Sequence, residues 1–270
     1  DGSVNFAIKT MLASDKTTRI TRRQLKDAVE KLFSDDSEVA LLYVASHGYV
    51  DSTGGYLVTS DVGAGDEGLS MDDVLNLANN SPAKSRVIIL DCCHAGKMGN
   101  VANLQNSAIL NEGVTILAGS TAEQNADEYG GFGVYTSLLI DALNGAAANL
   151  VGDVTPGSAY ALIDQTLGPW EQRPVFKTNV KNFVSLRKAK SPLEMNELRQ
   201  LTELFPKPDY DYPLDPSYEP ESGCPKQENM EKFRVLQHFN RVNLVVPFGE
   251  PADRNHMYFA AMDSKSCRLT

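Results

Sequence analysis

The stretch from Arg86 to Gly96 constrains the fold of this chain more than any other. It joins a run of four branched apolar residues to an acid, two thiols, an imidazole and a small-residue turn. A continuous apolar run of this kind is typical of a strand buried on both faces of a parallel sheet. In open α/β sheets, ligands bind just beyond the carboxyl ends of the strands, where Cys93 falls. The stretch therefore predicts an α/β fold and leaves three roles for Cys93: nucleophile, metal ligand or buried thiol.

The patterns on either side predict strands that alternate with helices. Buried strands are expected over 38–45, 86–91 and 114–119, a hairpin arm over 54–58, and further strands over 4–11 and 173–176. Helices are expected after the capping boxes at 21–24 and 70–73, and over 135–143 and 158–167. Strands that alternate with helices indicate βαβ units, so we expect a mostly parallel sheet flanked by helices.

A change in composition after about residue 190 predicts a division of the chain. Residues 1–186 are expected to form the α/β domain. Residues 187–226 are interpreted as a linker or arm, because 206–225 hold six prolines and three of the ten tyrosines. Proline is excluded from helix interiors and central strands. Residues 227–270, which begin with a helical pattern, are expected to form a small appended region of unknown role.

The charge of the chain limits its partners. Its 25 basic and 35 acidic residues give a formal net charge of −10, so neither nucleic acid nor an anionic membrane is expected as a partner. The sequence has no run of eighteen apolar residues that could span a bilayer. Cys92 and Cys93 are adjacent and are not expected to pair, which favours a reducing, cytoplasmic setting.

Reactive residues follow two of the expected strands. His47 follows the strand over 38–45, as Cys93 follows the strand over 86–91. Neighbouring strands lie about 4.8 Å apart, so groups at their carboxyl ends come within reach of proton transfer. A thiol becomes an effective nucleophile when a neighbouring imidazole takes its proton. The backbone amides of Gly48 and Cys93 are then candidates for an oxyanion hole.

Other roles for these residues have to be weighed. Successive side chains of a strand face opposite ways, so Cys92 and Cys93 cannot both point into one site, and Cys92 is expected to be buried. Three consecutive residues cannot easily converge on one ion, which argues against zinc bound by Cys92, Cys93 and His94. The simplest alternative for His47 is a polar packing residue at the end of a strand.

Two motifs in this chain resemble those of metacaspases and bacterial caspase-like peptidases. Val44–Gly48 is similar to the family's His-Gly motif, and Asp91–Gly96 is similar to its Asp-x-Cys-His-Ser-Gly motif. Gly119–Ala126 and Gly133–Thr136 resemble the region of the family's small subunit. The resemblance covers roughly residues 1–185 and implies a caspase–hemoglobinase fold whose first strand precedes Asp1. It also implies His47 as general base, Cys93 as nucleophile and a structural role for His94.

Asp91 is the main clue to substrate preference. It lies two residues before Cys93, so both side chains share one face of the strand. A carboxylate beside the nucleophile favours a cationic P1 side chain, and bidentate geometry favours Arg over Lys. In metacaspases the matching aspartate lines the S1 pocket, and Asp127 is a candidate second acid of this pocket. The alternative is that Asp91 caps the turn that follows it.

Calcium binding is a further property that the resemblance implies, and self-cleavage is an expectation if the enzyme cuts after basic residues. Lys97, the single base in the loop after the nucleophile, is the self-cleavage candidate. Asp61, Asp72 and Asp73 are the calcium candidates, although Asp73 also serves the expected capping box. No cofactor is expected to be required. Calcium is the one possible cofactor for which the sequence offers candidate ligands.

The leading prediction is a cytoplasmic cysteine endopeptidase that cuts protein substrates after Arg or Lys through a thioester acyl-enzyme. The alternative is a catalytically silent caspase-like adaptor that binds a regulatory protein through its C-terminal region. A metal-binding regulatory module is a third option, which the ligand spacing disfavours. The resemblance also implies a role in bacterial defence.

Overall fold

A four-stranded sheet forms the centre of the first part of the chain. The computed structural model describes residues 6–14, 17–63, 66–100, 109–124, 128–129, 132–167, 172–251 and 256–270. The sheet has the order β1-β5-β6-β10, made of β1 (Val39–Ala45), β5 (Ser85–Asp91), β6 (Val114–Ala118) and β10 (Val175–Asn179). The first three strands are parallel and β10 is antiparallel to β6. The predicted mostly parallel sheet is therefore confirmed.

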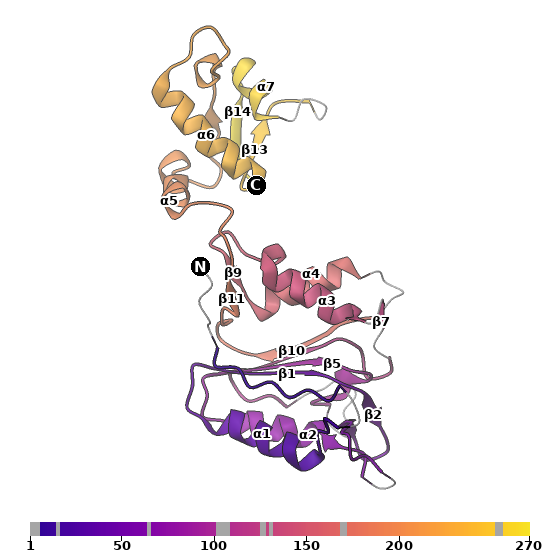
Figure 1. Cartoon of the computed structure of the whole chain (residues 1–270). Coiled ribbons are helices and arrows are strands. Elements are labelled where there is room, and N and C mark those ends of the chain that lie inside the picture. Colours follow the sequence, from indigo (N-terminus) through magenta and orange to yellow (C-terminus); the bar gives the residue numbers. More distant parts are fainter. Residues whose placement is uncertain are drawn as a thin grey trace. The chain divides into compact units, whose positions relative to one another are not determined.

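Helices cover both faces of this sheet (Figure 1). One face carries α1 (Arg22–Ser34) and α2 (Met71–Asn79), and the other carries α3 (Val134–Asp141) and α4 (Pro156–Thr166). Each face has its own apolar core. Within β5, Ile88 and Leu90 point to the α1/α2 core, whereas Val87 and Ile89 point to the α3/α4 core. This alternation is the reason that the strand is apolar along its whole length.

The helix starts are fixed by side-chain caps. Thr21 and Gln24 form the expected capping box of α1, and the helix ends at Ser34. The hydroxyl of Ser70 accepts the backbone N–H groups of Asp72 and Asp73 at the start of α2. Short elements surround the sheet: β2 (Gly48–Val50), β3 (Gly55–Leu57), β4 (Leu69–Ser70), β7 (Glu128–Tyr129), β8 (Phe132–Gly133), a 3₁₀ turn (Ala95–Lys97) and a π turn (Ala142–Ala146).

Two strand predictions need correction. Of the strand expected over 4–11, the described residues 6–11 are irregular, because apolar side chains there find no core: Ile8 is 78% exposed. The strand over 38–45 was expected to be buried like β5, but β1 lies at the end of the described sheet and its Tyr43 is 40% exposed. An apolar pattern alone does not distinguish a central strand from an edge strand.

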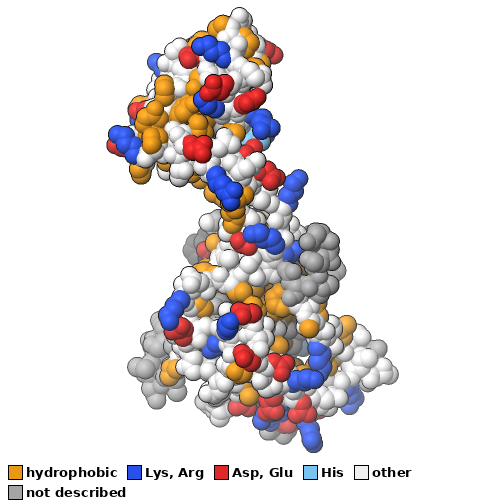
Figure 2. Space-filling view, turned by 90° about the vertical axis from the view of Figure 1, so that its left-hand side faces the viewer, with side chains coloured by type: hydrophobic (Ala, Val, Ile, Leu, Met, Phe, Trp, Pro, Cys, Tyr) orange, Lys and Arg blue, Asp and Glu red, His pale blue; other side chains and the backbone are white. Residues whose placement is uncertain are grey.

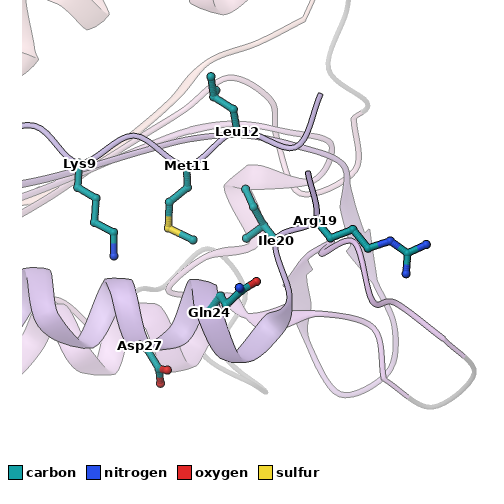
Figure 3. Close-up of a pocket in the computed structure, with 7 residues that line it drawn as sticks. All are labelled: Lys9, Met11, Leu12, Arg19, Ile20, Gln24 and Asp27. Carbon is teal, nitrogen blue, oxygen red and sulfur yellow. The ribbon is translucent and has the colours of Figure 1, made fainter. Parts of the chain in front are cut away.

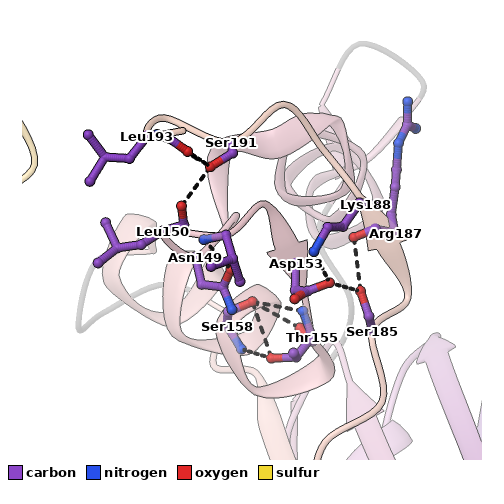
Figure 4. A network of polar contacts seen from close by, with 11 residues as sticks. Asn149, Leu150, Asp153, Thr155, Ser158, Ser185, Arg187, Lys188, Ser191 and Leu193 are labelled. Carbon is purple, nitrogen blue, oxygen red and sulfur yellow. Dashed lines mark hydrogen bonds and ion pairs between the residues drawn. The ribbon is translucent and has the colours of Figure 1, made fainter. Parts of the chain in front are cut away.

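The basic residues after residue 186 are partly neutralised in a small antiparallel pair of strands, β9 (Asp153–Val154) and β11 (Arg187–Lys188). Asp153 accepts a hydrogen bond from Ser185 at 2.8 Å and forms an ion pair with Lys188 at 3.0 Å (Figure 4). The capping box of α4, Thr155 with Ser158, lies beside this pair (Figure 4). β11 thus belongs to the first unit, which comprises residues 1–148 and 153–189.

Residues 149–152 and 190–270 form a second compact unit. Its elements are α5 (Met195–Leu204), β12 (Tyr212–Pro213), a 3₁₀ turn (Pro216–Tyr218), α6 (Gln227–Arg241), β13 (Val245–Phe248), α7 (Met257–Met262) and β14 (Ser266–Leu269). The proline-rich stretch does not stand apart as an arm. Leu214 and Tyr218 share one core with Phe233 and Phe239 of α6, because the aromatic rings of the stretch bury apolar area there.

Acidic and basic side chains are interspersed over the surface seen in Figure 2, where they lie close to one another. On this face, the acidic side chains therefore lie among basic ones. No helix in the described part of the chain is both long and apolar enough to cross a membrane.

Candidate active site

The register of β1 and β5 brings the predicted histidine and cysteine to one place. The last pair of the two parallel strands is Ala45 with Asp91, and the amide of Ser46 donates to the carbonyl of Asp91 at 3.2 Å. His47 and Cys93 each follow two residues after the members of this last pair. The two side chains therefore leave the same end of two neighbouring strands.

The last residues of both strands belong to the same face of the sheet. On β1, Val39 and Leu41 pack in the α3/α4 core, and the hydroxyl of Tyr43 bonds to Thr136 of α3. Alternation assigns Ala45 to this α3/α4 side, and Asp91, the last residue of β5, bonds to Thr136 on the same side. His47 is exposed and Cys93 is half-buried. The site is thus open to solvent at the carboxyl end of the sheet.

Gly48 lies directly against the backbone of Cys93. A Cβ atom added at Gly48 would lie 1.9 Å from the carbonyl oxygen of Cys93 and 3.3 Å from its amide nitrogen. Only glycine permits this approach, because any side chain would collide with backbone atoms that cannot rotate away. The contact brings the amides of the two predicted oxyanion-hole residues into one neighbourhood.

The turn after Cys93 is held by a dense set of hydrogen bonds. His94 adopts the left-handed conformation with φ 59°, which costs a residue other than glycine about 1–2 kcal/mol. Its amide donates to the carbonyl of Gln124 and its Nδ1 lies 2.9 Å from the carbonyl of Ala122. The buried hydroxyl of Ser120 donates to the carbonyl of Cys92 at 2.9 Å and accepts the amide of Ala95 at 3.3 Å. The predicted structural role of His94 agrees with these contacts.

Cys92 faces away from the site, as expected. It is 1% exposed and belongs to the α1/α2 core with Leu90 and Ala95. Burial, together with the nearby Asp91 and Cys93, raises the pKa of the Cys92 thiol to about 12. A thiol with so high a pKa is protonated at neutral pH and is a poor nucleophile.

Asp91 is buried at the start of helix α3. Its Oδ2 accepts hydrogen bonds from the amide of Thr136 at 3.2 Å and from the Thr136 hydroxyl at 2.5 Å. Because the Thr136 hydroxyl donates to Asp91, it accepts the hydroxyl of Tyr43 at 2.6 Å. A Cβ on Gly133 would lie 2.3 Å from the same Oδ2, so a larger residue at this position would displace the Asp91 carboxylate. Asp91 therefore stabilises the N-terminus of α3. The alternative prediction was that Asp91 caps the turn directly after it, whereas α3 begins more than 40 residues further along the chain.

The remaining substrate-site and cleavage candidates lie in different settings. Asp127 lies outside the described residues. The side chain of Lys97 packs over Gly55, and its amide donates to the carbonyl of His94 within the 3₁₀ turn. The bond after Lys97 is four residues from Cys93, a stretch that spans at most about 14 Å. Self-cleavage after Lys97 stays a prediction.

The calcium candidates do not form one site. Asp61 accepts the amide of Arg22 and the hydroxyl of Thr59, so it caps the start of α1. Asp72 lies near Asp73, and burial is the main cause of its raised pKa. Within the part of the chain that the structure describes, no three acidic, histidine or cysteine side chains are grouped to hold a metal ion. The dependence on calcium stays a prediction.

A separate pocket of about 410 Å³ lies in the first unit (Figure 3). It is formed by the irregular segment before α1 and the first turns of that helix. Figure 3 shows Lys9 and Met11 pointing from the segment toward α1, from which Gln24 and Asp27 project. Neither His47 nor Cys93 lines this pocket, so it is not the candidate active site.

Three residues that support the site were not singled out in the sequence. Ser120 and Thr136 stand in the motifs that resemble the caspase-like family, but nothing in the sequence tells which backbone groups they contact. Lys177 of β10 donates three hydrogen bonds to the turn after Cys93, although the two segments are about 80 residues apart in the chain. A single lysine in a short strand gives no sequence signal of such a contact.

The sheet order, the flanking helices and the site at the strand ends define a caspase–hemoglobinase fold. The chain belongs to the caspase domain family, whose model matches residues 3–260. It is therefore a caspase-family cysteine peptidase domain. The match reaches beyond the first unit into residues 190–260, which the motifs in the sequence did not cover.

Two solved structures resemble the chain at a distance. Protein GSU0716 from Geobacter sulfurreducens is 14% identical with a TM-score of 0.45, and the match covers 65% of this chain and 79% of that one. Caspase-1 from Spodoptera frugiperda is also 14% identical with a TM-score of 0.45, over 64% of this chain and 74% of that one. The comparison with curated proteins found no match.

Proposed function

We propose that this chain is a cysteine endopeptidase in which Cys93 is the nucleophile and His47 the general base. The observation that carries the proposal is the contact of Gly48 with the backbone of Cys93, because it fixes the residue after His47 against the nucleophile. The common face of the two strands and the family of the chain support the same assignment. The acyl-enzyme is then a thioester on Cys93.

The chemistry proceeds in two steps. His47 takes the proton from the Cys93 thiol, and the sulfur attacks the scissile carbonyl of the substrate. The amides of Gly48 and Cys93 stabilise the negative charge that develops on the carbonyl oxygen. His47 then gives its proton to the leaving amine, and in the second step it activates the water that hydrolyses the thioester.

A preference for Arg or Lys at P1 follows from Asp91. Its carboxylate is buried two residues before Cys93, and Thr136 fixes one oxygen, Oδ2. A buried acceptor of this kind favours a cationic side chain, which neutralises it on binding.

Labelling of the thiol tests the proposed nucleophile. We expect an Arg-chloromethylketone to modify Cys93 with a stoichiometry near one, as read by mass spectrometry of peptides from the Cys224→Ser chain. Removing Cys224 is needed because its exposed thiol would react without catalysis. The matched Cys93→Ala, Cys224→Ser chain should take up no label. A folded chain that stays unlabelled under these conditions would favour the silent adaptor.

Replacement of Asp91 tests the substrate preference. The variant Asp91→Asn keeps an oxygen that accepts the Thr136 bonds, whereas Asp91→Ala would also remove the cap of α3. We expect kcat/KM for Arg and Lys peptides to fall about 10²- to 10³-fold, the loss of one buried charge pair. Modification of Cys93 by the small neutral reagent iodoacetamide should continue at the wild-type rate.

A positional-scanning peptide library provides the contrary outcome. If the wild-type chain prefers Asp at P1, or if Asp91→Asn cleaves Arg peptides as well as the wild type does, the assignment of Asp91 is wrong. The library should be run with and without calcium, so that the same experiment tests the dependence on that ion.

A further inference from the structure

The turn that follows Cys93 rests on the side chain of Lys177. The ammonium group of Lys177 donates to the carbonyl of Gly96 at 2.8 Å, to the carbonyl of Met98 at 2.7 Å and to Oδ1 of Asn100 at 2.6 Å. These three acceptors match the three N–H donors of a protonated lysine. The contact binds the end of the 3₁₀ turn, where carbonyl groups carry partial negative charge.

Among the described residues, no carboxylate contacts the ammonium group of Lys177. Burial alone lowers the pKa of Lys177, and no described charged group contributes to the shift. On the elements packed against it, β6 carries no titratable side chain. In the turn, Nδ1 of His94 lies against the carbonyl of Ala122. The ammonium group of Lys97 interacts electrostatically with Asp72. A half-buried cation that only neutral acceptors compensate is costly, which suggests that its contact with the turn serves a purpose.

We propose that Lys177 is a positioning residue that holds the nucleophile turn in its reactive geometry, and that it does so only when it is protonated. A neutral amine has two N–H donors for the three acceptors, so one end of the turn is released when the proton leaves. Small displacements of a nucleophile reduce the rate strongly. The inference deepens the proposed peptidase function and depends on it for its effect on activity.

The titration gives the proposal a distinctive sign. Burial lowers the pKa of Lys177 from the ordinary 10.5 to about 8. Between these two values the unfolded chain binds more protons than the folded chain, so this group makes the free energy of unfolding rise with pH. The turn, in contrast, loses a hydrogen bond over the same range. Activity should therefore fall as the pH rises through about 8 while the contribution of Lys177 to stability increases.

Hydrogen exchange measures the turn independently of catalysis. In the inactive Cys93→Ala chain, we expect the amides of residues 94–100 to exchange about tenfold faster above pH 8 than below it. The rates are compared after correction for intrinsic exchange. The tenfold change corresponds to the loss of one hydrogen bond to a charged group. This measurement needs no change at Lys177. Adding Lys177→Met should give the fast exchange at every pH. The control Lys181→Met removes an exposed lysine paired with Glu112 and should leave the turn unchanged.

Kinetics of the active chain complete the test. Lys177→Met should lower kcat about 10- to 100-fold with KM within about twofold of wild type. Lys177→Arg, which stays protonated, should restore activity and move the alkaline limb of the pH profile upward. Unchanged exchange of the turn in the Cys93→Ala chain across pH 8, or Lys177→Met with wild-type kcat, would overturn the inference. A chain that shows the exchange effect but cleaves no peptide would instead refute the proposed function.

Discussion

The variant His47→Ala is expected to lower kcat/KM for Arg peptides by about 10²- to 10⁴-fold, the contribution of a general base. The thiol would then have to lose its proton to water, and the leaving amine would receive none from the enzyme. Because the His47 side chain is exposed, the free energy of unfolding should change by no more than about 0.5 kcal/mol. Steady-state kinetics with a thermal unfolding scan on the same preparation would measure both quantities.

A second histidine provides the control for this prediction. His256→Ala removes an exposed imidazole that caps α7 in the unit of residues 190–270 and should leave the catalytic rate at the wild-type level. A further check is the alkylation of Cys93 by an Arg-chloromethylketone, which should be lost in His47→Ala. Wild-type kcat/KM in a folded His47→Ala chain would mean that another group activates Cys93.

Among single methyl groups added to the first unit, the one introduced by Gly48→Ala is expected to reduce stability and activity most. The new Cβ would lie 1.9 Å from the carbonyl oxygen of Cys93, so the backbone of β2 or of the nucleophile turn has to move. Overpacking of this kind costs about 1–3 kcal/mol, which corresponds to a fall in Tm of roughly 3–12 °C for a chain of this size. Since the displaced groups are the oxyanion-hole candidates, kcat/KM should fall about 10²- to 10³-fold as well.

Gly54→Ala is the matched control on the same hairpin. A Cβ at Gly54 would meet only Oδ2 of Asp72, at 3.7 Å, which is an ordinary contact. The same methyl group should therefore leave both Tm and kcat/KM near the wild-type values. If Gly48→Ala and Gly54→Ala behave alike, the close approach of Gly48 to Cys93 does not matter for catalysis.

Much of the fold followed from local patterns. The capping box predicted at Thr21 and Gln24 forms at the start of α1. At the start of α2, only the Ser70 hydroxyl caps the helix, so the box predicted with Asp73 was wrong in that part. The box of Thr155 and Ser158 at the start of α4 was not predicted. The apolar run of β5 predicted a central parallel strand correctly. The irregular segment before α1 was wrongly expected to be a strand, because alternation says nothing about whether a partner strand is available.

The candidate site was also predictable in part, because local patterns place its residues at strand ends. His47, Gly48 and Cys93 stand at strand ends, and strand ends of a parallel sheet meet by topology, so their proximity could be expected from the sequence. The support of the turn could not be expected. Ser120 and Lys177 reach it from distant segments, and a hydroxyl or an ammonium group carries no record of which carbonyl it will contact.

The sequence by itself determined the order of strands and helices, the placement of His47 and Cys93 after two neighbouring strands, and the burial of Cys92. These features depend on periodicity and spacing, which are properties of neighbouring residues. Only the tertiary structure decided that Asp91 stabilises the start of α3, that Gly48 touches the backbone of Cys93 and that Lys177 supports the turn after Cys93. Such contacts join residues far apart in the chain, and they exist only after the sheet and its helices have packed.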